Sequence, residues 1–574
     1  MTRAILLSTA ITFAFFIVLV RLGELMLLEH QELSAKAMSQ YQRESHIKAG
    51  RGDIYDRRGR ELAVSLDAQS LYCDPAQVAS VRQDAMEIAK AVGVSYSEVE
   101  DKMSVTGKKH FIWIKRKLSE DQSDALKGMK LGPGIGFVDE SKRYYPEGSL
   151  AAQVLGYLNM DSKAQAGVEK EYSGTLTDKG GKVVVERDAT GKILSQGVQM
   201  ESRGDNVVLT IDEGLQFIAE SALDEAMQKW KAESAVVIMM DPYTGGILAM
   251  SSRPTFNPND PGAAEAAARR NRAIMDVYEP GSVFKIVMGS AGLETGTVTP
   301  QSVFNCYGGR FSVGGRTFHD VEKNGILTFE QIIQKSSNVG SIQVALKLGP
   351  ERLYKYARLL GFGQKTDIDL PSETGGYAKL PHSDVSLASM AIGYGVAVTP
   401  LQILRAYSAI ANGGYLVSPH VVSRITSPDG QTISSFHGQI QRVLKPETAA
   451  IFRKILGMVT QKGGTAEQAA VDGNAVCGKT GTARLFDPRT GRYSDKYAST
   501  FVGFVPAKDP KIAMIVVFKG PKGSIYGGVV SGPVFSTIAE KAFAYLNVPR
   551  DDADQGNIVY VGKGKDSHGV VYTP

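Results

Sequence analysis

Three short strings in a fixed order constrain this chain more than any other feature of its sequence. They are Ser282–Lys285 (SVFK), Ser336–Asn338 (SSN) and Lys479–Gly481 (KTG). Each string is easily met by chance among 574 residues, but together they match S-x-x-K, S-x-N and K-T-G in that order. Ser336 follows Ser282 by 54 residues and Lys479 follows it by 197. The combination predicts a fold that brings three distant segments to one nucleophilic site.

The first string begins where a turn leads into a helix. Pro280 and Gly281 mark the turn, and an apolar helical run follows from Val283 to Met288. Ser282 and Lys285 then lie on one helix face. A serine hydroxyl needs a base, and lysine can be that base only where burial and neighbours keep it neutral. Alone, this string would be better explained by a capping serine and a solvated lysine.

The second string follows an amphipathic helical stretch at 327–335. Its hydroxyl and carboxamide, from Ser336 and Asn338, are two residues apart and can relay a proton and orient Lys285. For this string alone, a helix cap is the more common role.

The third string lies in an expected strand, Lys479–Ala483. Gly481 leaves room for a substrate backbone to approach a sheet edge. Lys479 and the hydroxyls of Thr480 and Thr482 can hold a carboxylate. The alternative is an ordinary strand with a glycine bulge.

These motifs resemble those of the class B penicillin-binding proteins, the D,D-transpeptidases of cell-wall synthesis, and the resemblance covers nearly the whole chain. Further similar segments are Arg51–Gly59, Arg143–Pro146, Gly167–Glu169, Gly393–Pro400, Gly527–Gly528 and Pro533–Phe535. Two details are similar to the cell-division (FtsI-type) branch: Glu279 before Pro280, and the stretch Phe318–Gly340. The resemblance therefore favours a role in septal wall synthesis, with an elongation-type enzyme as the alternative.

The resemblance implies acyl transfer through a serine acyl-enzyme. Ser282 would attack a D-Ala-D-Ala stem peptide, Lys285 would act as base, and Ser336 and Asn338 would relay the proton and orient the lysine. β-Lactams would imitate the substrate and remain bound to Ser282.

The resemblance also implies how the substrate is held. Lys479, Thr480, Gly481 and Thr482 would bind it, with the hydroxyls and the lysine on its terminal carboxylate. Backbone N–H groups of Ser282 and Thr482 would form the oxyanion hole. No cofactor is implied.

An apolar, uncharged segment at 4–20 indicates where the protein resides. Its 17 residues are few for a membrane-spanning helix, but the apolar character continues past Arg21 to Leu28. Arg3 precedes the segment and favours a cytoplasmic N-terminus. The pattern predicts one transmembrane anchor at 4–28.

This anchor predicts a single-pass protein of the inner (cytoplasmic) membrane. Residues 1–3 would lie in the cytoplasm, and the chain beyond the anchor would lie in the periplasm. The alternative is a cleaved signal peptide, but no small-x-small cleavage site follows Val20.

The exported part divides into two modules. Residues 29–205 mix short strand-like and helical pieces without a catalytic constellation, and resemble the elongated pedestal, or dimerisation-like, domain of the family. Residues 206–546 have strands near both ends and helices between them. This pattern predicts an α+β domain, an antiparallel sheet packed with helices, similar to the penicillin-binding and serine β-lactamase fold. Residues 547–574 are expected to be a loosely ordered tail.

Other chemistry-bearing residues are expected to be structural. Asp53 and Glu169 are lone acids in the pedestal and predict ion pairs. Cys73, Cys306 and Cys477 are too few for a disulfide framework and are expected to be buried thiols. No CxxC or HExxH string occurs, so no metal site is predicted. A net charge of +5 without a basic run gives no support for nucleic-acid binding.

Three other functions are alternatives to the transpeptidase. A β-lactamase would carry an E-x-x-L-N string between Asn338 and Lys479, and none occurs. A β-lactam sensor would carry an intracellular part, whereas only three residues precede the expected anchor. A non-catalytic scaffold would not need every residue of the three motifs, and all of them are present here.

The resemblance implies a partner. No glycan-polymerising segment occurs at 31–203, so the glycan strands must come from another protein. The resemblance implies that this partner is a polytopic SEDS-type glycosyltransferase of the division machinery, which contacts the anchor and the pedestal of the present chain.

Overall fold

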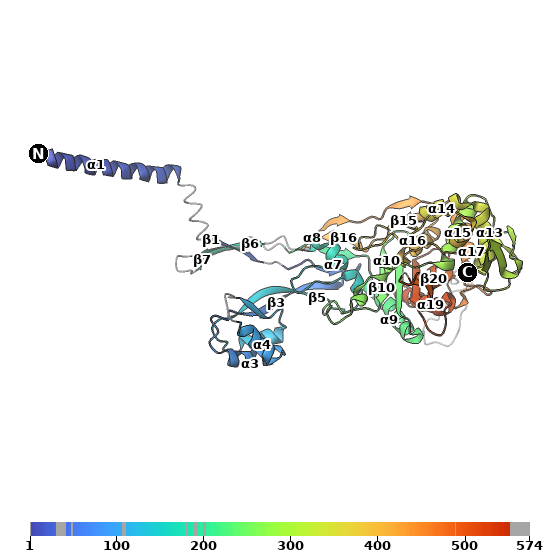
Figure 1. Cartoon of the computed structure of the whole chain (residues 1–574), viewed down its shortest axis with the longest axis horizontal. Helices are drawn as coiled ribbons and strands as arrows, with labels where there is room; N and C mark the ends of the chain where they lie inside the picture. Colours follow the sequence, from blue (N-terminus) through green and yellow to red (C-terminus); the bar gives the residue numbers. More distant parts are fainter. Residues whose placement is uncertain are drawn as a thin grey trace, which may run out of the picture.

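The computed structural model describes residues 2–29, 42–47, 50–105, 111–177, 181–187, 193–198, 203–487 and 489–551. Met1 and most of the expected tail, 552–574, lie outside the described residues. Figure 1 shows an N-terminal helix, a pedestal of strands and small helices, and a larger C-terminal domain.

The N-terminal helix comprises α1 (Thr2–Gly23) and the π-helical turn η1 (Glu24–Leu28). Its segment Ile5–Leu27 has a mean hydropathy of 2.4 and buries none of its surface against the protein. By length and composition it can cross a membrane, as the apolar pattern predicts. It is the one such helix in the part of the chain that the structure describes.

The pedestal is organised around the long strand β3 (Glu61–Cys73), which pairs with β5 (Ile135–Tyr144) from Val64 to Cys73. Three helices pack beside this ribbon, with Leu71, Ile88, Val99 and Leu126 in their shared core. The remaining elements are β4 (Ile112–Lys115), α3 (Val81–Val92), α4 (Tyr96–Met103), α5 (Glu120–Lys127), α6 (Ala152–Leu155), α7 (Gly167–Glu171), α8 (Ser173–Leu176) and a separate sheet of β1 (Gln42–Ile47), β6 (Gly181–Arg187) and β7 (Ile193–Val198).

One sheet joins the pedestal to the C-terminal domain. Strand β2 (Ile54–Tyr55) pairs antiparallel with β3 and parallel with β8 (Asn206–Leu209). The ladder continues to β16 (Val422–Thr426) and β17 (Thr432–Ser435). The expected module boundary between residues 205 and 206 is therefore crossed by backbone hydrogen bonds, including Val207 N–H to the Asp53 carbonyl at 2.9 Å.

The lone acids of the pedestal are ion-pair partners, as predicted. Glu169 is fully buried and accepts from Arg51 Nε and Arg143 Nε, both at 2.6 Å. Asp53 lies 3.8 Å from both Arg143 and Arg203. A buried carboxylate needs such partners because its desolvation is otherwise uncompensated.

The C-terminal domain is built on a five-stranded antiparallel sheet in the order β10-β9-β21-β20-β19. The strands are β9 (Ser234–Met240), β10 (Ile247–Arg253), β19 (Cys477–Asp487), β20 (Arg492–Val505) and β21 (Ile512–Lys519). Because both faces are covered, β9 is apolar at nearly every position. Val237 and Met239 pack with α9 (Glu213–Trp230) and α19 (Gly532–Leu546), while Val236 and Ile238 join the helical core opposite.

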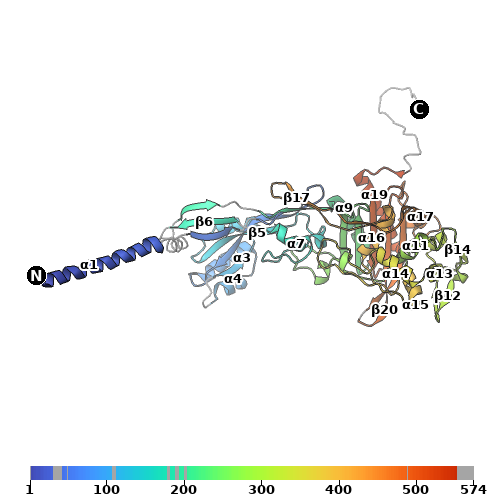
Figure 2. The same cartoon turned by 90° about the horizontal axis from the view of Figure 1, so that it is seen from above.

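The helices on the sheet face opposite α9 and α19 include the segments that carry the S-x-x-K and S-x-N strings (Figure 2). The predicted α+β fold, with strands near both ends of the domain's sequence and helices between them, is confirmed. The elements are α10 (Arg272–Met275), η3 (Gly281–Phe284), α11 (Lys285–Glu294), β11 (Val303–Asn305), β12 (Arg310–Val313), β13 (Arg316–His319), β14 (Ile326–Thr328), α12 (Phe329–Gln334), α13 (Asn338–Leu348), α14 (Pro350–Leu359), α15 (Asp384–Ala391), α16 (Pro400–Ala411), β15 (Tyr415–Val417), β18 (Ile440–Arg442), α17 (Pro446–Gly457) and α18 (Gly527–Val530).

Candidate active site

The nucleophile turn, residues 280–284, carries the expected nucleophile Ser282 and leads into α11. The expected helix near Ser282 begins as the single 3-10 turn η3, which continues into α11 at Lys285. Gly281 has φ +57°, a left-handed conformation that favours glycine, and a Cβ there would lie 3.3 Å from the Thr482 carbonyl. Ser282 is partly exposed, whereas Val283 and Lys285 are buried. The turn therefore presents the hydroxyl outward and the amine inward.

Lys285 is the centre of the buried polar group. Its Nζ donates to the Ser336 carbonyl at 2.6 Å, to Asn338 Oδ1 at 2.9 Å and to Ser336 Oγ at 3.3 Å. The side chain is fully buried, and burial lowers the pKa of Lys285 to about 7, against the opposing charge of Asp320. A neutral amine is thus available near neutral pH. The first two strings meet here, as predicted.

In the second string, Ser337 caps a helix, whereas Ser336 and Asn338 bind Lys285. Ser337 is the helix cap, since its hydroxyl accepts from Gly340 N–H at 3.0 Å at the start of α13. Ser336 has φ +59°, which is unusual for serine, and turns its carbonyl and hydroxyl to Lys285. The capping alternative therefore applies to Ser337, while Ser336 and Asn338 face the lysine.

Asp320 belongs to this site, although none of the three motifs includes it. Its carboxylate accepts from Ser337 Oγ at 2.7 Å, from Asn338 N–H at 2.5 Å and from Val339 N–H at 2.9 Å. The one sequence signal was its place in the stretch similar to the division branch. Besides Asn324 Nδ2, its partners are backbone N–H groups and a hydroxyl at the start of α13, which leave no residue pattern to recognise.

The third string lies on β19, the edge strand beside the nucleophile turn. A Cβ on Gly481 would lie 3.0 Å from both the Pro280 carbonyl and Val283 Cγ1. The missing side chain thus admits the nucleophile turn itself, a reason that the sequence did not indicate.

The polar groups of β19 are fixed in place. Lys479 is buried and donates to the Thr480 carbonyl at 3.3 Å and to Thr480 Oγ1 at 3.4 Å. Burial and the charge of Lys285 lower the pKa of Lys479. The Thr480 hydroxyl also pairs with Thr465 Oγ1 at 2.8 Å, a contact that sequence reasoning missed, and Thr482 Oγ1 accepts from Gly527 N–H at 3.3 Å.

The arrangement can perform acyl transfer on a carboxylate-bearing substrate. A partly exposed serine lies one helical turn from a lysine of lowered pKa. Two buried lysines repel one another, so an anion at Thr480 and Thr482 would offset their charge. The three cysteines are buried free thiols, as predicted, and Cys477 binds the Arg453 carbonyl at 3.2 Å instead of a site residue.

Comparison with known proteins agrees with this geometry. The penicillin-binding protein transpeptidase domain matches residues 235–540, and the penicillin-binding protein dimerisation domain matches residues 46–209. The peptidoglycan D,D-transpeptidase FtsI of Escherichia coli K12 is 32% identical over 99% of this chain and 96% of its own. The probable peptidoglycan D,D-transpeptidase PenA of Neisseria meningitidis serogroup A is 33% identical over 88% of this chain and 85% of its own.

Solved structures show the same fold. Penicillin-binding protein 2X from Streptococcus thermophilus has a TM-score of 0.71 at 25% identity, over 88% of this chain and 80% of its own. Penicillin-binding protein 3 from a Mycobacterium, complexed with aztreonam, has a TM-score of 0.68 at 28% identity, over 88% and 98%. By length and composition, the apolar N-terminal helix can anchor the chain in a membrane. The chain belongs to the class B penicillin-binding proteins and is a serine-type peptidoglycan D,D-transpeptidase.

Proposed function

We propose that this transpeptidase cross-links peptidoglycan at the division septum, with Ser282 as its nucleophile. The observation that carries the site assignment is the buried amine of Lys285, which binds Ser336 and Asn338 beside that serine. The septal role is supported by the similarity to FtsI over 99% of the chain. An elongation-type enzyme is the alternative, since relatives with other names match at similar identity.

The proposed reaction has two steps. Lys285 removes the Ser282 proton, an ester forms between Oγ and the penultimate D-Ala carbonyl, and the terminal D-Ala leaves after its amine takes that proton. The amine of a second stem peptide then attacks the ester, which restores the serine and leaves a new amide. A β-lactam forms the same ester, but its opened ring stays attached.

The remaining site residues bind the substrate in this proposal. Lys479, Thr480 and Thr482 hold the terminal carboxylate, and Gly481 admits the nucleophile turn. Backbone N–H groups of Ser282 and Thr482 stabilise the oxyanion.

Cell biology tests the septal assignment. A fluorescent fusion of the full chain is expected to gather at midcell before constriction, and depletion is expected to give filaments. A fusion spread along the sidewall, with round cells on depletion, would instead assign the chain to elongation.

The proposed topology places residues 1–3 in the cytoplasm and the anchor at 4–28. The pedestal at 29–205, the transpeptidase domain at 206–546 and the tail at 547–574 lie in the periplasm. A reporter active only in the periplasm is expected to work when fused after Pro574, with residues near Met1 retained in the mature protein. Mature chains that begin between about residues 20 and 35, the length range of secretory signals, would indicate a cleaved signal peptide.

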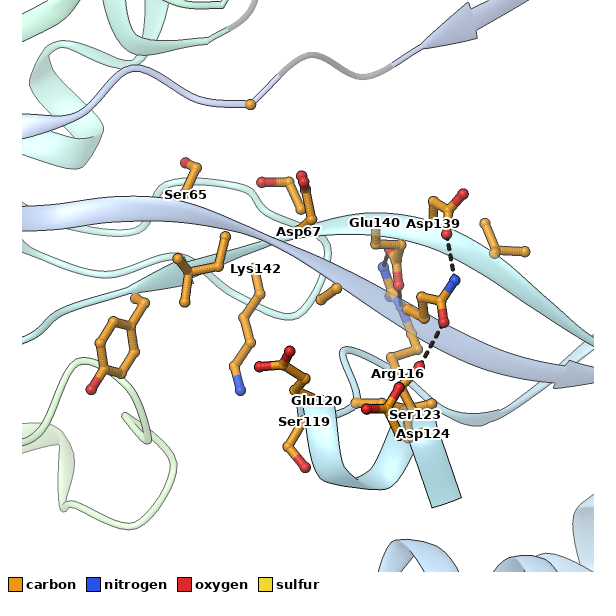
Figure 3. Close-up of a pocket in the computed structure, with 18 of the residues that line it drawn as sticks. Ser65, Asp67, Arg116, Ser119, Glu120, Ser123, Asp124, Asp139, Glu140 and Lys142 are labelled. Atoms are coloured by element: carbon orange, nitrogen blue, oxygen red, sulfur yellow. Dashed lines mark hydrogen bonds and ion pairs between the residues drawn. The ribbon is translucent and has the colours of Figure 1, made fainter. Parts of the chain in front are cut away.

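A SEDS-type glycosyltransferase is the proposed partner, with the anchor and pedestal as its contacts. The pedestal has a groove of about 1590 Å³ beside β3, β5 and α5. Figure 3 shows Asp67, Glu120 and Lys142 among its charged residues. A groove with both signs of charge can select a partner by electrostatic complementarity.

Charge reversal in the groove tests this partner. Asp67→Lys is expected to weaken co-purification of the glycosyltransferase, because Asp67 is exposed and lines the groove. Asp101→Lys is the control, since Asp101 is an exposed acid of α4 outside the groove. Equal co-purification in both variants would remove the groove from the interface.

A further inference from the structure

The S-x-N segment is held by a carboxylate from another part of the chain. We propose that Asp320 is a positioning residue of the transpeptidase reaction, which fixes Asn338 in the orientation that Lys285 requires. The proposal rests on the function assigned above to Lys285, and it adds a residue that lies outside the three motifs.

The first argument is the number of groups that Asp320 binds. One oxygen accepts from the N–H groups of Asn338 and Val339, and the other accepts from Ser337 Oγ at 2.7 Å and Asn324 Nδ2 at 2.9 Å. The two N–H groups belong to the first turn of α13, where no preceding carbonyl of the helix can pair with them. A carboxylate at this end is also favoured by the helix dipole. Asp320 therefore anchors the backbone of Asn338.

The second argument is the side chain of Asn338. Its Nδ2 donates to the His319 carbonyl at 2.9 Å, while its Oδ1 accepts from Lys285 Nζ at 2.9 Å. The His319 carbonyl thus holds the side-chain nitrogen of Asn338, and the Asp320 carboxylate holds its backbone N–H. An amide fixed in this way presents its oxygen, not its nitrogen, to the lysine. Loss of the Asp320 contacts would free both the backbone position and this orientation.

The third argument is electrostatic. Burial lowers the pKa of Lys285, and the negative charge of Asp320 acts in the opposite direction. Lys479 faces the same amine from β19, and the Cys306 thiol touches Ser337 Oγ at 3.5 Å. Removing the Asp320 charge leaves burial, which favours the neutral amine of Lys285. The pKa of Lys285 should then fall further, and the acid limb of the acylation profile should move to lower pH.

The test uses Asp320→Asn in the full-length protein in detergent. The rate of acylation by a fluorescent penicillin is measured from about pH 5 to 9, a window that contains a lysine pKa near 7. The acid limb is expected to move down by about one pH unit, the size typical of removing one nearby opposite charge. The plateau rate is expected to fall by about ten- to a hundred-fold, as expected of a displaced catalytic group.

Glu373→Gln is the matched control. Glu373 accepts from Thr366 N–H at 2.7 Å, Thr366 Oγ1 at 2.6 Å and Asp367 N–H at 3.1 Å, the same kinds of donor that Asp320 binds. It lies in another loop and binds no motif residue through these contacts. Its variant is expected to lose thermal stability while its acid limb stays at the wild-type pH.

The outcomes separate the proposal from its premise. An unshifted acid limb in Asp320→Asn, with rate loss that only follows loss of stability, would overturn the proposal. A wild-type profile without any limb near pH 7 would instead count against Lys285 as the base.

Ser337→Ala covers the case in which Asp320→Asn does not fold. It removes one donor to Asp320 and keeps the charge, so the plateau rate is expected to fall several-fold with the limb unmoved. An unchanged plateau rate would overturn the positioning role.

Discussion

Ser282→Ala is expected to abolish covalent labelling by penicillin. The ester oxygen of the acyl-enzyme is Ser282 Oγ in the proposed reaction, and no other hydroxyl lies one helical turn before Lys285. Intact-mass measurement of the wild-type protein is expected to show one penicillin adduct per chain, and peptide mapping is expected to place it on the peptide that contains Ser282. The variant is expected to show no adduct and a melting temperature close to that of the wild type, because this side chain is partly exposed.

Ser290→Ala is the control for this experiment. Ser290 lies on the same helix, is fully buried, and has no hydrogen-bond partner for its hydroxyl in the described residues. It is expected to label as the wild type does. Labelling of Ser282→Ala to the wild-type extent would disprove the assignment of the nucleophile.

Lys285→Arg is expected to slow acylation by about a hundred- to ten-thousand-fold, the usual contribution of a general base. Arginine keeps the charge and can still donate to Ser336 and Asn338, but its guanidinium remains protonated and cannot accept the serine proton. Stopped-flow measurement of the acylation rate, alongside thermal melting, separates this loss from unfolding.

The pH dependence of the wild-type enzyme belongs to the same prediction. With a pKa of about 7, the neutral form of Lys285 increases as pH rises through 7, so acylation is expected to accelerate there. The arginine variant is expected to lack this inflection, whereas Lys335→Arg, at an exposed lysine, is expected to retain rate and profile. Near-normal acylation by Lys285→Arg would exclude Lys285 as the base.

The residues expected to carry out the reaction could be predicted from the sequence, whereas most contacts that hold them in place could not. Ser282, Lys285, Ser336 and Asn338 stand in recognisable motifs, because the proposed reaction needs a hydroxyl, a base and groups that orient that base. The α+β class of the C-terminal domain was also predictable, since strands near both ends and helices between them leave distinct apolar patterns. Glu169 was recognised as an ion-pair partner, but its arginines, at positions 51 and 143, lie far away in the sequence.

The supporting contacts could not be predicted because they depend on tertiary structure. Two of the four donors to the Asp320 carboxylate are backbone N–H groups, which every residue type except proline carries. Thr465 reaches Thr480 only because its loop folds back against β19. The need for glycine at 481 comes from the approach of Pro280, 201 residues earlier in the chain.

The sheet that joins the two modules has a mechanical consequence. Strand β2 of the pedestal is hydrogen-bonded to β8 of the transpeptidase domain, and the buried carboxylate of Asp212 binds Arg58 and Arg60 across the same junction. Bending at this point would break backbone hydrogen bonds and leave a buried charge uncompensated. The junction is therefore expected to resist bending, so that a force applied to the pedestal would be transmitted to the transpeptidase domain.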